Sequence, residues 1–130
     1  MSALRRTAAA LTLAGVLVVA ACDSGPQGPG VLVARVTSPQ PLGAVVLEFT
    51  GGGITGFEAR GTTRVFGSVD TSADRRHRVI LVSPTGATEV SFGIAFKDRA
   101  AEMPAVVAVV AASPTNAVVS AAGLKVRIER

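Results

Sequence analysis

The feature that most constrains the fold of this chain is a series of short valine-rich segments separated by glycine, proline, threonine and serine. Side chains branched at Cβ favour extended strands, whereas glycine and proline favour turns. Segments of this length, divided by turn residues at this spacing, predict an all-β chain. The predicted strands cover residues 31–38, 42–49, 54–59, 63–69, 77–83, 89–96, 105–112 and 124–129.

Two of these segments, 89–96 and 124–129, have an apolar residue at every second position. This alternation is typical of strands with one buried face. The run 79–82, Val-Ile-Leu-Val, has no polar alternation and predicts a central strand that is covered on both faces. The residues predicted to face inward in the two alternating segments are Val90, Phe92, Ile94, Phe96, Leu124, Val126 and Ile128.

Residues 101–113 could form a helix or a strand, because their alanines permit a helix and Pro104 could begin one. Four valines within 106–110 favour a strand instead, since branched side chains lose rotamer freedom in a helix. We therefore predict a strand over 105–112 and a helical turn at 98–103. Together the segments predict a single antiparallel β-sandwich of about seven or eight strands.

The N-terminus has a different pattern, in which two arginines, Arg5 and Arg6, precede an apolar run of 15 residues. That run is shorter than the roughly 20 residues that a membrane-spanning helix needs. It ends in Ala20 and Ala21, and Cys22 follows directly. The whole order resembles the signal peptide and lipobox of a bacterial lipoprotein. The alternatives are an uncleaved membrane anchor and a conventional signal peptide that leaves a free cysteine.

The lipoprotein resemblance implies cleavage between Ala21 and Cys22 and a diacylglycerol on the Cys22 sulfur. It also implies a further fatty acyl chain, such as palmitate, on the new amine. Two or three chains anchor a protein firmly where one would bind marginally. The expected organisation is a signal peptide (1–21), a lipidated cysteine with a flexible tether (22–30) and a β-sandwich domain (31–130). We expect a membrane-anchored protein of the cell envelope, facing the periplasm or the exterior.

The tether is predicted from the segment 23–30, DSGPQGPG, which has no apolar periodicity and is rich in glycine and proline. Eight extended residues reach at most about 25 to 28 Å. The domain is therefore expected to stay close to the membrane surface.

Composition excludes several classes of function. Removing Arg5 and Arg6 with the signal peptide lowers the formal net charge from +4 to +2, so the basic balance gives little reason to expect nucleic-acid binding. With Cys22 lipidated, no cysteine remains for a disulfide. The chain has no Trp and no Tyr, the residues on which sugars usually stack, and its five Phe are predicted to lie mainly in the core.

Catalysis would have to use His77, the only histidine. It lies beside arginines at the start of a predicted strand, and we expect it to be an exposed loop residue without a catalytic role. No G-x-S-x-G motif is present. The alternative is a small envelope hydrolase in which His77 acts with a nearby carboxylate and hydroxyl, the candidates being Asp70, Asp74, Ser68, Ser72 and Ser83.

Metal and phosphate sites are not predicted, and no cofactor is expected. One histidine and no free cysteine exclude the usual zinc ligand sets. The glycines 51–53 lack the Lys-Ser/Thr of a P-loop, and we expect a hairpin turn there. Calcium could bind only if two loops converged in space, because the available carboxylates do not match an EF-hand; these are Asp70, Asp74, Asp98 and Glu102.

Three arginines within four positions, Arg75, Arg76 and Arg78, form the most strongly charged cluster of the chain. They could contact anionic lipid headgroups, each contributing about 1 kcal/mol near a charged membrane. The alternative is a solvated loop whose charge is balanced by Asp70 and Asp74.

Two stretches, 43–59 (GAVVLEFTGGGITGFEA) and 89–98 (EVSFGIAFKD), resemble paired strands of cohesin-like β-sandwiches. The resemblance covers about half of the mature chain and implies a fold like that of small lipoproteins of unassigned function. Cohesins usually have a Tyr-Asp-Pro-like turn where this chain has Thr50, Gly51 and Gly52, so dockerin binding is not inferred. We expect a lipid-anchored binding or structural module of the envelope, not an enzyme, with an envelope protein as its partner.

Overall fold

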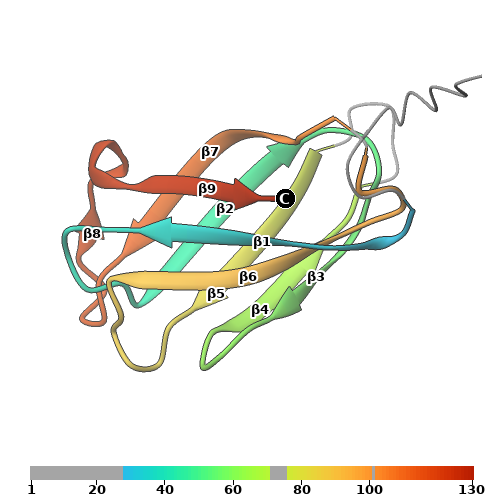
Figure 1. The fold of residues 1–130 in the computed structure, drawn as a ribbon. Helices are drawn as coiled ribbons and strands as arrows, with labels where there is room; N and C mark the ends of the chain where they lie inside the picture. Colours follow the sequence, from blue (N-terminus) through green and yellow to red (C-terminus); the bar gives the residue numbers. More distant parts are fainter. Residues whose placement is uncertain (1–27, 71–75, 101) are drawn as a thin grey trace, which may run out of the picture.

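A computed structural model describes residues 28–70, 76–100 and 102–130, which form two antiparallel sheets packed face to face (Figure 1). The predicted all-β sandwich is confirmed. A two-residue strand that periodicity could not reveal, β8, raises the number of described strands to nine. The strands are β1 (Gly30–Thr37), β2 (Ala44–Thr50), β3 (Ile54–Ala59), β4 (Arg64–Ser68), β5 (Arg76–Val82), β6 (Glu89–Phe96), β7 (Ala105–Ala112), β8 (Val118–Val119) and β9 (Lys125–Glu129).

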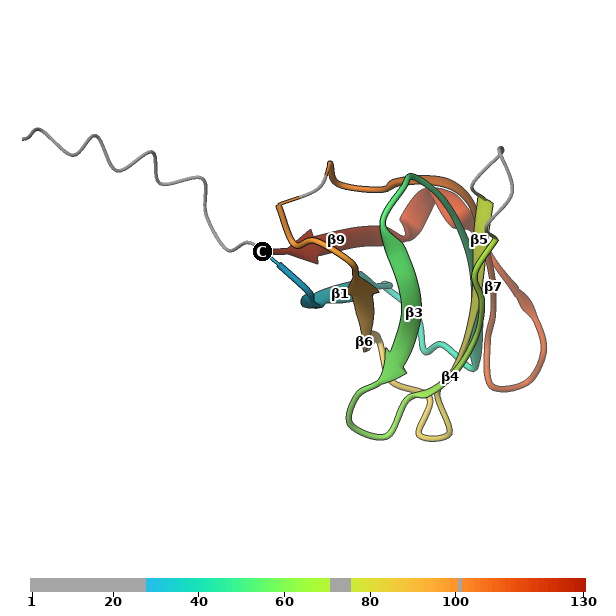
Figure 2. The ribbon, with the colours of Figure 1, turned by 90° about the vertical axis from the view of Figure 1, so that its right-hand side faces the viewer.

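The four-stranded sheet has the order β3-β6-β1-β9, and the five-stranded sheet has the order β4-β5-β2-β7-β8. Strands β1 and β2 lie inside their sheets and pair antiparallel with both neighbours. The chain passes from one sheet to the other between β3 and β4, and these two edge strands lie close together along one side of the sandwich (Figure 2). A short 3-10 helix (Ala121–Gly123) precedes β9.

The core is formed by the inward-facing side chains of both sheets. Phe49 of β2, Phe57 of β3 and Phe92 of β6 pack in its centre, with ring centroids 6.1 to 6.3 Å apart. The inward residues predicted in 89–96 are buried, and those predicted in 124–129 pack partly buried against the core. The exception among the phenylalanines is Phe66, whose side chain faces solvent.

The predicted burial of both faces of residues 79–82 is wrong. Val79 and Leu81 are buried, but Ile80 is 39% exposed. The physical reason is that a sandwich has only two layers, so the outer face of each sheet lies open to solvent. The predicted helical turn at 98–103 is also not found in the described part of this segment, where Arg99 and Ala100 form a turn.

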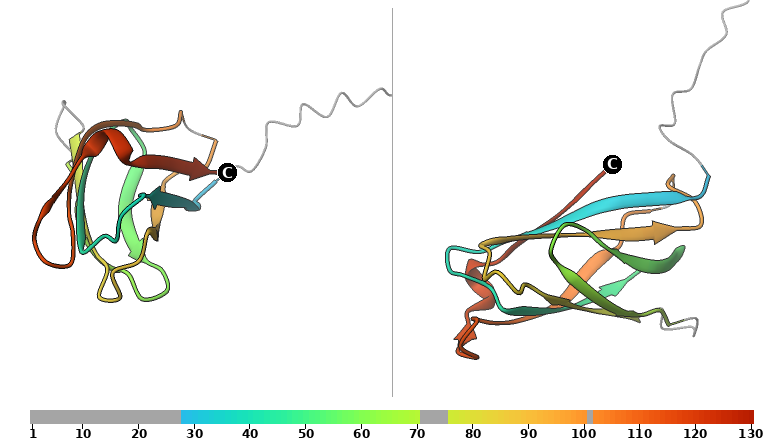
Figure 3. Two further views of the ribbon diagram at one scale, coloured as in Figure 1. Left: turned by 90° about the vertical axis from the view of Figure 1, so that its left-hand side faces the viewer. Right: turned by 90° about the horizontal axis from the view of Figure 1, so that it is seen from below.

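One end of the sandwich holds most of the sequence-predicted site residues, and we call it the N-terminal end because β1 starts there. Register places Gly30 opposite Phe96, and Thr50 opposite both Arg76 and Ala105. The β2–β3 connection and the β6–β7 connection therefore meet at this end. Strand β9 runs toward the same end and finishes short of it, with Glu129 opposite Val33 of β1 (Figure 3). Within the described ranges, no helix is long and apolar enough to span a membrane.

Candidate functional site

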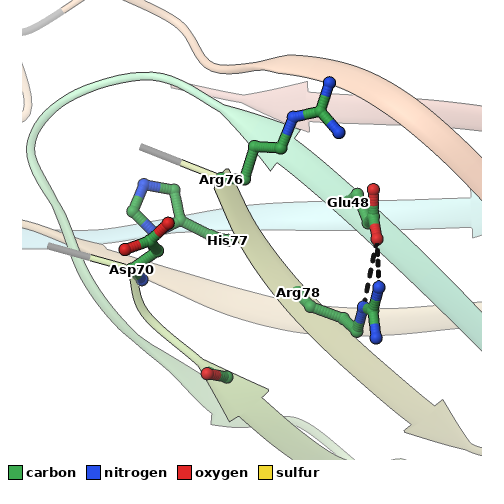
Figure 4. Close-up of a pocket in the computed structure, with 6 residues that line it drawn as sticks. Glu48, Asp70, Arg76, His77 and Arg78 are labelled. Atoms are coloured by element: carbon green, nitrogen blue, oxygen red, sulfur yellow. Dashed lines mark hydrogen bonds and ion pairs between the residues drawn. The ribbon is translucent and has the colours of Figure 1, made fainter. Parts of the chain in front are cut away.

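A pocket of about 440 Å³ opens near the N-terminal end, beside β2, β4 and β5 (Figure 4). The residues that line it lie up to 30 positions apart in the sequence. Several of them were singled out by the sequence, and Glu48 was not. The lining residues are Glu48, Ser68, Asp70, Arg76, His77 and Arg78.

His77 is buried, with only 3% of its surface exposed, and lies within β5. Its prediction as an exposed loop residue is wrong, because β5 begins at Arg76 and turns His77 to the same inward face as Val79 and Leu81. Every second residue of a strand faces the same side, so the inward positions of Val79 and Leu81 also place His77 inward. The sequence contains this signal once the strand is taken to begin at Arg76.

Both ring nitrogens of His77 are bonded to backbone. The N–H of Asp70 donates to Nδ1 at 3.1 Å, and Nε2 lies 2.9 Å from the carbonyl oxygen of Gly51. Because Nδ1 accepts, the proton of the neutral ring is on Nε2 and is donated to Gly51. The imidazole thereby joins the segment after β4 to the connection between β2 and β3.

This arrangement adds no support to the hydrolase alternative. Ser68 and Asp70 line the same pocket as His77, but neither ring nitrogen has a lone pair left to accept a proton from a hydroxyl nucleophile. Ser83 is buried at the other end of β5, where its Oγ accepts the N–H of Ala87. Ser72 and Asp74 lie outside the described residues.

The arginine cluster is divided between different environments. Arg78 donates from Nε to Oε1 of Glu48 at 3.1 Å, and its Nη2 contacts the same oxygen. This hydrogen bond, with a smaller contribution from Arg76, lowers the pKa of Glu48. Arg76 is exposed, and Arg75 lies outside the described residues.

Glu48 was missed because its pairing with Arg78 arises across strands. The two residues stand opposite each other in the β2–β5 register, 30 positions apart in sequence. No local spacing indicates such a pair before the strand order is known.

The remaining carboxylates of the described residues do not gather into a metal site. In the described ranges, no three residues of the His, Cys, Asp and Glu types lie close enough to hold an ion. Asp98 instead accepts the backbone N–H groups of Gly28 and Ala100, each at 3.0 Å. These two bonds, led by that from Ala100, lower the pKa of Asp98. Asp98 therefore fixes the turn after β6 and the start of the described domain.

The glycines 51–53 form a connection between the two sheets, so the expected hairpin turn is wrong. The strands on either side, β2 and β3, belong to different sheets and do not pair. Gly51 accepts from His77, and Gly53 accepts the N–H of Lys97 at 2.8 Å. Gly53 has φ of +88°, a conformation that glycine adopts readily.

Comparison of the chain with protein-family models, with curated proteins and with solved structures gave no match. The predicted cleavage and lipidation residues, Ala21 and Cys22, lie outside the described residues.

Proposed function

We propose that this chain is a lipid-anchored cell-envelope protein whose β-sandwich is a non-enzymatic binding or structural module. The observation behind the anchor is the order Arg5-Arg6, apolar run, Ala20-Ala21-Cys22. A glycine- and proline-rich segment follows, and the first strand begins at Gly30, eight positions after Cys22. A lipidated cysteine needs such a spacer so that the folded domain can clear the membrane surface.

Two hydrogen bonds at Gly28 support a short spacer between Cys22 and the folded domain. Asp98 holds the N–H of Gly28, and the carbonyl oxygen of Gly28 accepts the N–H of Arg99 at 2.8 Å. The chain is therefore fixed from Gly28 onward, and the six steps from Cys22 to Gly28 span at most about 22 Å. This length keeps the domain beside the membrane and not far out in the envelope.

The environment of His77 supports the non-enzymatic half of the proposal. A general base needs a nitrogen that can reach a substrate or nucleophile proton. The His77 ring is buried and uses both nitrogens to hold backbone groups of its own chain. This is the pattern of a structural histidine.

The anchor is tested by replacing Cys22 with Ser, which removes the thiol that would accept the diacylglyceryl group. We expect loss of fatty-acid labelling, and either accumulation of the precursor or release from the membrane fraction. Ser24→Ala is the matched control, since it changes a nearby hydroxyl and keeps Cys22. Equal labelling and equal membrane retention of wild type and Cys22→Ser would overturn the anchor.

Binding is separated from a purely structural role by a pull-down from envelope extracts with the lipid-free domain. Retention of the same envelope protein or polymer in repeated experiments would support a binding module. If no envelope component is retained, the binding role is rejected and the structural role remains.

A further inference from the structure

The outer face of the five-stranded sheet has a continuous apolar surface that the proposed function leaves without a role. Strand register aligns eight apolar residues in two neighbouring rows that cross this sheet. We call them the outer apolar patch. The first row is Phe66, Ile80, Val46 and Val110, and the second row is Val82, Ala44, Ala112 and Val118.

Alternation along each strand shows why these residues face outward. In β5, Val79 and Leu81 are buried, so Ile80 and Val82 point to the other side. In β2, Val45 and Leu47 are buried, so Ala44 and Val46 point to the outer side. The patch is thus the reverse side of the strands that build the core.

Several members of the patch are strongly exposed. Phe66 is 59% exposed, Val110 62% and Val118 88%. Single exposed apolar residues are common on proteins, but a contiguous apolar surface with a polar rim marks a membrane or protein contact. The patch is therefore a surface suited to contact with a partner.

The rim of the patch is positively charged. Arg64 stands opposite Val82 at one edge, and Arg76 and Arg78 occupy outward positions of β5 on the other side of Ile80. The one acid among the described outward residues of these five strands is Glu48, which is bonded to Arg78. Asp70, which follows β4, also lines the pocket beside Arg76, so the three arginines of the rim exceed the two acids by one charge.

The outer face of the four-stranded sheet has a different chemistry. Arg35 bridges Glu89 at 3.0 Å and Glu129 at 3.4 Å. The hydrogen bond that Arg35 donates to Glu89 is the main cause that raises the pKa of Arg35. Lys125 and Arg127 are exposed on the same sheet. Alternating charges of both signs are typical of a solvated face.

We propose that the outer apolar patch docks onto an anionic lipid bilayer. Its apolar side chains would enter the headgroup boundary, and Arg64 and Arg76 would contact lipid phosphates. A second copy of the chain fits less well, because two such faces would bring the same excess positive charge together. The proposal uses the proposed lipid anchor only to explain why the face lies near a membrane.

The dimensions allow both contacts at once. The chain enters the domain at Gly28, next to β1 in the four-stranded sheet, and the docking face belongs to the other sheet. Packed sheets are about 10 Å apart, whereas Cys22 and Gly28 can be separated by about 22 Å. An anchored domain could therefore lay its five-stranded sheet on the bilayer.

The test uses residues 23–130, so that no lipid contributes to binding. Every described strand and every buried core residue lies between Gly30 and Glu129, so this chain keeps the whole described domain. Binding is measured by flotation with vesicles of phosphatidylcholine alone or mixed with phosphatidylglycerol. We expect binding to the mixed vesicles only, weakening as salt is raised.

Two matched double variants distinguish docking from general charge attraction. Arg64→Ser with Arg76→Ser removes two charges from the docking face, and Lys125→Ser with Arg127→Ser removes two from the opposite sheet. Each basic residue at the membrane contributes about fivefold in affinity, so the first pair should weaken binding by about 25-fold. The second pair should change it by less than about threefold.

A third variant, Phe66→Ser, tests the apolar contribution and should also weaken vesicle binding. Circular dichroism and urea unfolding establish that each variant is folded. Equal effects of the two double variants, or no effect of Phe66→Ser, would overturn the proposal. So would a concentration-dependent dimer that Phe66→Ser dissociates and that does not bind vesicles. The Cys22→Ser experiment is independent, because the fragment lacks Cys22.

Discussion

His77 donates its Nε2 proton to the carbonyl oxygen of Gly51 across 2.9 Å and so joins β5 to the connection that leads into the other sheet. A buried imidazole is stable only if its polar atoms find partners, and the N–H of Asp70 supplies the second one. The only histidine of the chain therefore has a structural task at the N-terminal end of the sandwich.

Replacing His77 with Ala should destabilise the domain. The substitution leaves the Gly51 carbonyl and the Asp70 N–H without this partner and opens space behind β5. Each buried polar group that loses its hydrogen bond costs about 1–3 kcal/mol. We expect the free energy of unfolding, measured in urea, to fall by about 2–4 kcal/mol.

Arg76→Ala is the control for His77, since it changes the adjacent, exposed residue of the same strand. Its effect should stay within about 0.5 kcal/mol. Similar losses for the two variants would show that the His77 bonds are not what stabilises this end of the sandwich.

Gly43, at the opposite end of the sheet from His77, is a second position where a substitution should destabilise the domain. A Cβ at this position would lie 2.7 Å from the carbonyl oxygen of Ser113 and 2.9 Å from the Cα of Pro114. These are backbone atoms, and Gly43 itself is bonded to Ala112 and Ser83. Gly43→Ala should therefore lower the free energy of unfolding by about 1–3 kcal/mol.

A comparison with Gly56 separates crowding from the general effect of removing a glycine. A Cβ at Gly56 of β3 would have no atom within 4 Å. Gly56→Ala should thus leave the urea midpoint nearly unchanged. If both alanines destabilise equally, crowding by Ser113 and Pro114 is not the cause.

The sequence predicted the fold class and most strands, because alternation and turn residues are local signals. The strands over 54–59, 89–96 and 105–112 have the predicted bounds, and the choice of a strand for 105–112 is confirmed. Strand β8 was missed because two residues show no period. The exposure of Ile80 could not be predicted, since it depends on how many layers cover the sheet.

The candidate site was less predictable than the fold. The pairing of Glu48 with Arg78 and the two bonds of His77 join residues that only the strand order brings together. The outer apolar patch needs the register of five strands before its rows can be recognised. Cys22 and Arg75 lie outside the described residues, and their roles stay predictions.

Phe92 should be among the most sensitive positions of the core. Its ring is fully buried between Phe49 and Phe57, with centroid separations of 6.3 Å to each. Truncation of such a ring leaves a cavity that the neighbouring rings cannot fill, so Phe92→Ala should cost about 3–5 kcal/mol. The urea unfolding curve measures this loss.

Phe66→Ala provides the matched phenylalanine on the outer surface. Because Phe66 is exposed, its truncation should change stability by no more than about 0.5 kcal/mol. A loss at Phe66 as large as that at Phe92 would contradict both the core assignment and the outward position of Phe66.

The stability of the folded domain should depend on pH through the Asp98 carboxylate. Bonds from the N–H groups of Ala100 and Gly28 hold its pKa below the ordinary value of 3.8 in the folded domain. The unfolded chain therefore binds a proton more readily than the folded one. The stabilisation by Asp98 is fully present above the unfolded pKa and is lost as the pH falls from about 3.8 through the folded pKa.

Asp98→Asn keeps an acceptor oxygen for these amides but removes the charge that titrates. The variant should lose less stability than wild type as the pH falls through this window, as measured by urea unfolding at a series of pH values. Glu102→Gln removes a nearby carboxylate that the two amides do not use, and its profile should follow that of wild type. A wild-type profile as flat as that of Asp98→Asn would show that the Gly28 and Ala100 bonds do not favour the charged form.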